Sequence, residues 1–220
     1  MTTPTINDLW PFFGLTITAP PVRLAYPTDE IIAELVECAD DIHSPGASPF
    51  MGSWSIDKPE VRARSILQFQ WWSRATVSPD KWQLPFAVVI DDEVAGVQDA
   101  FAENFHQTRV AKTGSWLNRK FQGQGFGTVA RRAILHFLFE GLGAVIAQTE
   151  AFESSAASRC VTEKLGYQPD GETLAIRGDG EVDRVIRYRY EQADWEANLW
   201  ADDITIAGLE PCLPLLGLDG

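Results

Sequence analysis

The sequence predicts a mixed α/β fold in which a twisted, mostly antiparallel sheet is flanked by helices. Strand-like apolar segments follow one another over 84–117 and again over 167–190, which is typical of antiparallel strands. Helical patterns stand before and between these two groups. A glycine-rich turn at 123–127 joins a strand to a helix. Strands grouped in this way, with interposed helices, indicate an α+β or mixed α/β domain.

The N-terminal part contains two short extended segments and one helix. Residues 15–19 and 22–25 have extended character and are separated by two prolines. Thr28 is a suitable N-cap for a helix that reaches about Cys38, because its hydroxyl can accept a hydrogen bond from a free amide of the first turn. Residues 1–13 precede these elements and carry aromatic side chains, so we expect this extension to dock on the body of the protein or on a partner.

A long loop over 40–55 separates this helix from the next one. Its prolines and glycines are turn formers, and loops of this length are often functional lids. The loop also carries three large apolar side chains, Phe50, Met51 and Trp54. We therefore expect the loop to form a wall of a binding site. A second helix follows, with Asp57 as its cap.

The central part reads as a hairpin, a third strand and a helix. Apolar strands over 84–90 and 94–101 flank an acidic turn, and a third strand covers 109–117. Apolar residues at helical spacing predict a helix over 128–139. Glycines end this helix, and another strand follows over 144–151.

The C-terminal part reads as a helix, a hairpin and an apolar tail. The expected elements, in order, are a helix from Ser154 or Ser155 through Lys164, a left-handed stop at Gly166, a hairpin of strands 167–177 and 182–190 around Gly178-Asp179-Gly180, and a short helix over 191–200. The apolar side chains of the final segment predict that it covers either this chain or a second subunit.

Composition bounds the function. The formal net charge is −13 across 220 residues, which argues against binding to nucleic acid or to an anionic membrane because both require a positive surface. The acidity favours a cationic partner such as an amine, or serves solubility alone. No apolar run approaches the length of a transmembrane helix.

Cysteine and histidine are sparse. The three cysteines do not have the spacing of a disulfide framework or a zinc site, and the three histidines are dispersed. We therefore expect no bound metal and a reducing, cytoplasmic location. The N-terminus also lacks the basic and apolar regions of a signal peptide.

The glycine-rich turn indicates a pyrophosphate site. Gly123, Gly125 and Gly127 alternate directly before a helix, and the basic residues Arg119 and Lys120 precede them. Glycines allow backbone amides to approach a ligand closely, and the first amides of a helix attract anions. A dinucleotide fold requires Gly-x-Gly-x-x-Gly, and a nucleoside-triphosphate loop requires Gly-Lys-Ser/Thr, so both fit poorly.

Two motifs give the chain a family resemblance. The run Gln122-Gly123-Gln124-Gly125-Phe126-Gly127 resembles the Gln/Arg-x-x-Gly-x-Gly/Ala motif with which GNAT N-acetyltransferases bind the pyrophosphate of coenzyme A. Residues 114–117 and 157–167 resemble segments of the branch that acetylates the N-termini of ribosomal proteins. The resemblance covers roughly residues 14–192 and implies a single GNAT domain over 1–220, with a C-terminal extension at 193–220.

The resemblance implies where acetyl-CoA binds. The sheet is expected to splay between strands 109–117 and 144–151, with the pantetheine arm in the splay. The backbone of Trp116, Leu117 and Asn118 would pair with this arm, and a backbone N–H near Leu117 or Asn118 would bind the oxyanion. The expected pyrophosphate-binding residues are Gln122, Gly123, Gln124, Gly125, Phe126, Gly127 and Thr128. No metal is implied.

The chain departs from the family pattern at two positions. Ser155 stands where many relatives have an asparagine that binds pantetheine. Thr162 stands where many relatives have a tyrosine that protonates the leaving thiolate. The resemblance transfers that role to Ser158, because a serine at this position lies near the thiol in the resembled branch. Support of the helix start is the alternative role.

The general base is left open by the sequence. The strand 109–117 has no carboxylate, so the candidates lie on neighbouring strands. We favour Glu103 and Glu150, with Asp99 and a water chain as alternatives. His106 is a further candidate from its ordinary pKa, although it reads as a loop residue.

These observations predict an enzyme that transfers an acetyl group from acetyl-CoA to a primary amine of a protein or a small molecule. The alternatives are succinyl-CoA as donor, an aminated antibiotic as acceptor, and a non-catalytic acyl-CoA-binding module. A succinyl group would require a cation in the acyl pocket, and the candidates are Arg62, Arg64 and Arg74. The apolar terminal segments also allow a homodimer or larger oligomer.

Overall fold

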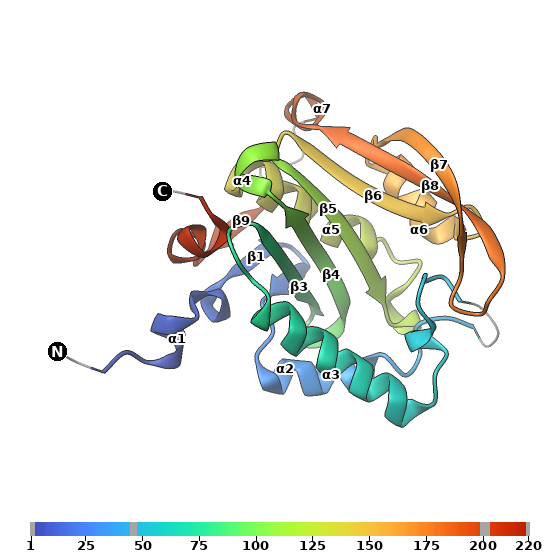
Figure 1. Ribbon diagram of the computed structural model, residues 1–220, viewed down its shortest axis with the longest axis horizontal. Helices are drawn as coiled ribbons and strands as arrows, with labels where there is room; N and C mark the ends of the chain where they lie inside the picture. Colours follow the sequence, from blue (N-terminus) through green and yellow to red (C-terminus); the bar gives the residue numbers. More distant parts are fainter. Residues whose placement is uncertain (1–2, 45–47, 199–202, 219–220) are drawn as a thin grey trace.

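The computed structural model describes residues 3–44, 48–198 and 203–218. In this part of the chain one sheet contains nine strands in the order β7-β8-β6-β5-β4-β3-β2-β1-β9, and every neighbouring pair is antiparallel except β5 and β6. The expected mixed, mostly antiparallel sheet flanked by helices is therefore confirmed (Figure 1). The strands are β1 (Thr16–Ala19), β2 (Val22–Ala25), β3 (Lys81–Ile90), β4 (Glu93–Glu103), β5 (Val110–Leu117), β6 (Ile146–Phe152), β7 (Gln168–Ile176), β8 (Val182–Glu191) and β9 (Thr205–Ala207).

Helices cover both faces of the sheet. Helices α2 and α3 lie on one face, and α5 and α6 lie on the other (Figure 1). The helices are α1 (Ile6–Leu9), α2 (Asp29–Cys38), α3 (Pro59–Ala75), α4 (Phe105–Thr108), α5 (Phe126–His136, continued by a π-helical turn, Phe137–Gly141), α6 (Ala156–Lys164) and α7 (Gln192–Ala197). Among the described residues no helix is both long and apolar enough to cross a membrane.

Two helix starts differ from the expected ones. Lys58 occupies the N-cap position of α3, so Asp57 is not the cap. Helix α5 begins at Phe126, two residues before Thr128, because Gly125 has φ of 89° and serves as a left-handed N-cap. Thr28 does cap α2 as expected, since its hydroxyl accepts from the amide of Ile31.

Each face of the sheet has its own apolar core. On the α5 face, buried side chains such as Ile134 and Phe137 pack with Leu24 and Phe86 of the sheet. A smaller cluster on the α2 and α3 face includes Leu35 and Ile66 together with Ala87, Val89 and Val97. Alternate residues of β3 and β4 therefore contribute to opposite cores, as the two-residue period of a strand requires.

The two terminal segments pack on this chain. Strand β9 pairs with β1, with Ile17 opposite Ile206. Cys212, Leu216 and Leu218 are buried in the larger core, and so is Phe12 of the N-terminal segment. The apolar tail that the sequence left unassigned thus covers the sheet of its own subunit.

The sheet opens between β5 and β6. These parallel strands pair only from Val110 opposite Ile146 to Thr113 opposite Thr149. Side-chain hydrogen bonds close the end of the paired part: the Thr149 hydroxyl donates to the Thr113 carbonyl (3.0 Å), and the Thr113 hydroxyl donates to the Gln148 carbonyl (3.4 Å). Beyond this point the strands diverge. We call the opening the fork, and it is the splay that the family resemblance implies.

Candidate active site

A cavity of about 1180 Å³ occupies the fork and reaches both faces of the sheet. The part of the cavity on the α5 and α6 face contacts the glycine-rich turn, and we call this part the donor side. The part on the α2 and α3 face contacts the loop 40–55 and the buried ends of β3 and β4, and we call this part the acceptor side. Residues that line it include His43, Phe50, Trp54, Phe69, Gln70, Gln83, Asp99, Phe101, Ser115, Trp116, Leu117, Arg119, Gln122, Gly123, Gly125, Gly127, Thr128, Arg131, Thr149, Glu150, Ser155 and Ser158.

The glycine-rich turn offers backbone to the cavity. Gly123 and Gly125 have φ of 73° and 89°, and a Cβ at either position would contact no protein atom within 4 Å. These conformations favour glycine, and the space beside them belongs to the cavity. The first turn of α5 also directs its free amides there. The turn thus has the shape and polarity that a pyrophosphate group needs.

The side chains around the turn mostly hold the protein together. Gln122 donates from Nε2 to the carbonyls of Ile42 and Leu117, both at 2.7 Å, and so ties the loop 40–55 to the turn. Gln124 donates to the Lys120 carbonyl at 2.6 Å. Gln124 and Phe126 are outside the set of described residues that line the cavity. The lining therefore does not support the expected pyrophosphate contacts of these two residues.

The two basic residues before the turn are paired with acids. Lys120 pairs with Glu93 and is not among the described residues that line the cavity. Arg119 lines the cavity and pairs with Asp41 at 3.2 Å. Arg119 is therefore the better placed of the two to screen phosphate charge.

The edge of β5 presents selected amides to the fork. The N–H of Asn118 donates to the Ala95 carbonyl of β4 at 2.9 Å, and its side chain donates to the Cys38 carbonyl at 2.7 Å. Backbone groups alternate in direction along an antiparallel strand, so the N–H groups of Ser115 and Leu117 point away from β4 into the fork. The oxyanion role that was open between Leu117 and Asn118 is thus available to Leu117.

Ser155 and Ser158 line the cavity at the start of α6, as the resemblance implies. Thr162 is 1% exposed, and its hydroxyl donates to the Ser158 carbonyl at 2.9 Å. The residue at the family's tyrosine position is therefore committed to the helix backbone. Ser158 remains the hydroxyl of this helix that is placed to meet a ligand.

The acceptor side contains a buried carboxyl group. Asp99 lies on β4, is 8% exposed, and accepts a hydrogen bond from the Gln83 side chain. Its second oxygen, Oδ1, is buried without a partner among the described residues. Burial raises the pKa of Asp99 to about 7, against the smaller opposing effect of the Gln83 hydrogen bond. A carboxyl with such a pKa can exchange a proton near neutral pH.

The other expected bases are placed less well. Glu103 is exposed at the end of β4, where Lys81 lies 2.6 Å away and holds the pKa of this carboxyl below its usual range. Glu103 does not contact the cavity, so this position does not support the expected role. Glu150 is exposed on β6 and does line the cavity. His106 is bonded to the Pro79 carbonyl outside the cavity.

Aromatic side chains form the wall of the acceptor side. The ring of Trp54 makes tilted contacts with Phe50 of the same loop and with Trp116 of β5, at centroid distances of 5.0 and 5.9 Å. Phe69 of α3 and Phe101 of β4 add to this wall. The described part of the loop 40–55 is therefore the binding-site wall that its composition predicted.

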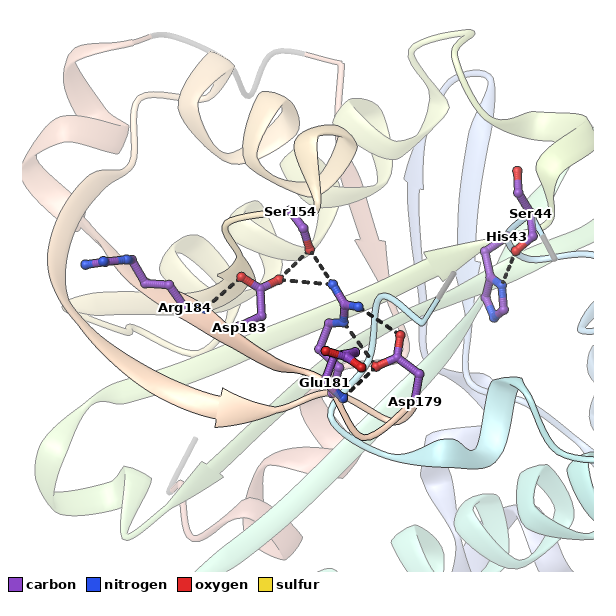
Figure 2. Close-up of polar contacts among 8 residues, drawn as sticks. His43, Ser44, Ser154, Asp179, Glu181, Asp183 and Arg184 are labelled. Carbon is purple, nitrogen blue, oxygen red and sulfur yellow. Dashed lines mark hydrogen bonds and ion pairs between the residues drawn. The ribbon is translucent and has the colours of Figure 1, made fainter. Parts of the chain in front are cut away.

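The β7–β8 hairpin holds the loop in place. The N–H of Gly178 donates to the Phe50 carbonyl at 2.9 Å. A Cβ at Gly178 would lie 2.3 Å from the Gly52 carbonyl oxygen, so glycine permits this contact. Ser154, Asp179 and Asp183 gather at the hairpin end, across from His43 and Ser44 of the loop (Figure 2). Arg177 pairs with both aspartates, at 2.9 and 3.5 Å.

The expected cations of α3 do not reach the cavity. Arg62 pairs with Asp40, and Arg74 pairs with Asp29. Among the described residues that line the cavity, neither of them nor Arg64 is found. Arg131 of α5 does line the cavity and is 3% exposed. Among the described residues no cluster of three His, Cys, Asp or Glu side chains could hold a metal.

The sequence patterns used above single out neither Arg131 nor the burial of Asp99. Arg131 precedes the buried Ile134, Leu135 and Leu138 at helical spacing, so this periodicity was the available signal for a buried arginine. No signal of this kind exists for Asp99. Its surroundings come from distant parts of the sequence, namely Gln83 of β3 and the residues of α3 and of the loop 40–55 that line the same cavity.

Comparison with known proteins gives one consistent family. The acetyltransferase (GNAT) domain matches residues 31–168. YdaF of Bacillus subtilis, provisionally named a ribosomal N-acetyltransferase, is 26% identical over 133 residues, which are 56% of this chain and 71% of YdaF.

Solved structures share the fold. A GCN5-related N-acetyltransferase from Brucella melitensis superposes with a TM-score of 0.65 at 17% identity, covering 83% of this chain and 80% of that chain. The ribosomal-protein-S5-alanine acetyltransferase of Vibrio fischeri gives 0.60 at 13% identity, with 82% and 98% covered. The microcin C7 self-immunity acetyltransferase MccE, solved with acetyl-CoA and AMP, gives 0.59 at 18% identity, with 78% and 93% covered.

Proposed function

The chain belongs to the GNAT acetyltransferase family, and on this premise we propose that it transfers an acetyl group from acetyl-CoA to a primary amine within a ternary complex. The observation that carries the proposal is a single cavity with a glycine-rich anion seat on its donor side and Asp99 on its acceptor side. Donor and acceptor would meet in the fork, and holding two reactants in line contributes on the order of 7–11 kcal/mol to catalysis.

The donor side fits acetyl-CoA. The open glycine turn and the free amides of α5 suit the pyrophosphate, with Arg119 beside them. The N–H groups of Ser115 and Leu117 suit the pantetheine arm and the thioester carbonyl. Ser155 and Ser158 add hydroxyl groups from α6. When bound, acetyl-CoA supplies the activated acyl group, and the protein supplies position and polarity.

Asp99 is the proposed general base. The amine must lose a proton as it forms the new bond to the acyl carbon. A carboxyl with a pKa near 7 can accept that proton at neutral pH, directly or through water. Its unpartnered Oδ1 is the natural acceptor atom. The Leu117 N–H would stabilise the negative charge that develops on the carbonyl oxygen. Glu150 remains the second candidate, because it also lines the cavity.

The acceptor side favours an amine carried by an apolar group. Its wall is aromatic, and Asp99 is the carboxylate beneath it. A small aralkylamine would fit this environment, as would the N-terminal residue of a protein with an apolar side chain. The names of YdaF and of the Vibrio fischeri protein refer to ribosomal acceptors, which keeps a protein N-terminus among the proposed substrates. A polycationic antibiotic would find little acidic surface there.

Acceptor-dependent thiol release tests the proposal. The assay would combine acetyl-CoA or succinyl-CoA with aralkylamines, diamines, lysine peptides and peptides with apolar N-terminal residues, and would measure free thiol and product mass. We expect thiol release with acetyl-CoA and an apolar amine, together with the mass increase of one acetyl group. Tight CoA binding without turnover on any acceptor would instead favour the non-catalytic module.

A further inference from the structure

Arg131 is a buried cation whose partners are all neutral. Its side chain leaves α5 one helical turn after the glycine-rich turn and reaches the closed end of the fork. Its Nη2 donates to the Ser115 hydroxyl (3.0 Å), its Nη1 to the Thr149 hydroxyl (3.2 Å) and its Nε to the Gln98 side-chain oxygen (3.4 Å). Side chains from β4, β5 and β6 therefore hold this guanidinium at the place where β5 and β6 separate.

This arrangement leaves the positive charge without a counter-charge. A buried charge is costly unless it is paired. Across residues 3–44, 48–198 and 203–218, no carboxylate lies within 4.0 Å of Arg131, although twelve other ion pairs are present. A guanidinium has five N–H donors, so the three hydrogen bonds leave two, and the neutral hydroxyl of the buried Tyr167 also lies beside this guanidinium. Because Arg131 also lines the cavity, its positive charge is available to a ligand.

The position of Arg131 identifies which part of the ligand it would meet. The proposed donor enters with its pyrophosphate at the glycine turn and its thiol at the other end of the arm. The thiol is therefore the group that comes nearest to the closed end of the fork, where Ser115 and Thr149 contact Arg131. The hydrogen bonds between Thr113 and Thr149 close the sheet just beyond this point.

We infer that Arg131 is a catalytic residue that stabilises the thiolate of coenzyme A as it leaves. This inference rests on the proposed function. Arg131 would also fill the role toward the thiolate that the family's tyrosine plays. In this chain Thr162 stands at that position, and its hydroxyl is hydrogen-bonded to the Ser158 carbonyl. A fixed cation at the site of developing negative charge lowers the barrier without reorganisation during the reaction.

The proposed step balances as follows. The amine nitrogen forms a bond to the acyl carbon, and Asp99 accepts one proton from that nitrogen. The carbon–sulfur bond then breaks, and its electron pair stays on sulfur beside the Arg131 guanidinium. The proton held by Asp99 returns through water to the thiolate, which leaves the protein as a neutral thiol. Arg131 keeps its protons throughout.

The experiment measures the ionisation of the bound thiol directly. Coenzyme A would be titrated on the protein by its thiolate absorbance, with desulfo-CoA-loaded protein subtracted to remove the signal of Cys38, Cys160 and Cys212. For the native chain we expect a bound thiol pKa at least about one unit below that of Arg131→Met, which corresponds to a tenfold difference in thiolate. Arg131→Lys should retain part of the shift, because it keeps a charge.

One control variant and three contrary results make the experiment decisive. Arg132→Met removes the neighbouring arginine, which pairs with Asp203, and should leave the bound thiol pKa unchanged. Equal values for the native chain and a folded Arg131→Met would overturn the inference, and so would a shift that disappears in Ser158→Ala. A third contrary result would be an unshifted thiol together with a preference for succinyl-CoA that Arg131→Met abolishes, since Arg131 would then bind an acyl carboxylate.

The outcome can be separated from that of the proposed function. The titration needs no acceptor and no turnover, so a shifted thiol can be observed even if no amine is acetylated. Conversely, amide formation with an unshifted thiol would leave the acetyltransferase proposal intact and remove only the role of Arg131.

Discussion

The donor and acceptor sides of the fork are built in different ways. The donor side comes from one continuous stretch of chain, 114–128, with the first turn of α6 beside it, and it offers mainly backbone amides. The acceptor side combines the loop 40–55, α3, β3 and β4, and it offers aromatic side chains and one buried carboxyl. Backbone recognition needs a particular local geometry, whereas side-chain recognition needs distant segments to pack together.

This difference predicts that variants of the two sides will change different measured properties. Substitutions on the donor side should weaken CoA binding for every acceptor. Substitutions on the acceptor side should change turnover or the amine KM and leave CoA affinity unchanged. In a kinetic or binding test of one side, the property of the other side therefore serves as the internal reference.

The largest effect is expected at Asp99. Asp99→Asn removes the proposed base, so kcat should fall by about 10²–10⁴-fold while the Kd for CoA stays unchanged. The native kcat/KM should rise through a pKa of about 7, and this limb should be absent from the residual activity of the variant. The matched control is Glu103→Gln, outside the cavity. A native-like rate in Asp99→Asn would transfer the role to Glu150 or to water.

The raised pKa of Asp99 also predicts how the free energy of unfolding depends on pH. Burial raises its pKa from 3.8 to about 7 in the folded state, so between these pH values the folded chain binds more protons than the unfolded chain. The free energy of unfolding therefore falls as pH rises through this window and levels off above it. Asp99→Asn should be more stable than the native chain at pH 8, by up to about 4 kcal/mol. Urea denaturation at pH 4 and pH 8 would reveal the difference, which should shrink at the lower pH.

The next largest effect is expected on the donor side. Gly125→Glu places a negative side chain at the glycine-rich turn, and it requires the glutamate backbone to adopt a left-handed conformation. CoA affinity should fall by about 100-fold or more, which is ~2.8 kcal/mol, as measured by calorimetry. Gly180→Glu is a matched control, because Gly180 has the same φ of 89° and equally open surroundings but lies outside the cavity. Similar losses in both variants would mean that backbone strain, rather than the seat, causes the effect.

The same difference explains what the sequence could predict. The glycine turn, the cap Thr28 and the hairpin around Asp179 depend on local geometry, so their residues were recognisable in order along the chain. The fork followed from the family resemblance. Arg131 lies at helical spacing from buried residues of α5, so its burial had a local signal in the sequence. The burial of Asp99 depends on tertiary packing, which neither local spacing nor composition reveals. Glu103 was favoured for the same reason, because the sequence does not show that Lys81 lies opposite it.

The smallest effect tests whether the two sides are separate at all. Trp54 belongs to the acceptor wall, yet its ring lies 5.9 Å from that of Trp116 on the donor strand β5. Trp54→Ala should raise the KM for an apolar amine by about tenfold, or ~1.4 kcal/mol, because the amine loses an aromatic surface to bury against. Steady-state kinetics with saturating acetyl-CoA would measure this. Trp72→Ala is the control, since Trp72 is 47% exposed on α3 and outside the cavity.

The Kd of Trp54→Ala for CoA decides whether the donor and acceptor sides act independently. If the Kd for CoA is unchanged, Trp116 holds its position through its pairing with Val97 of β4, and the sides act independently. If CoA affinity falls together with amine affinity, the contact between Trp54 and Trp116 transmits the loss to β5. The loop 40–55 would then shape both sites, which its second attachment, from Gln122 to Ile42, makes physically reasonable.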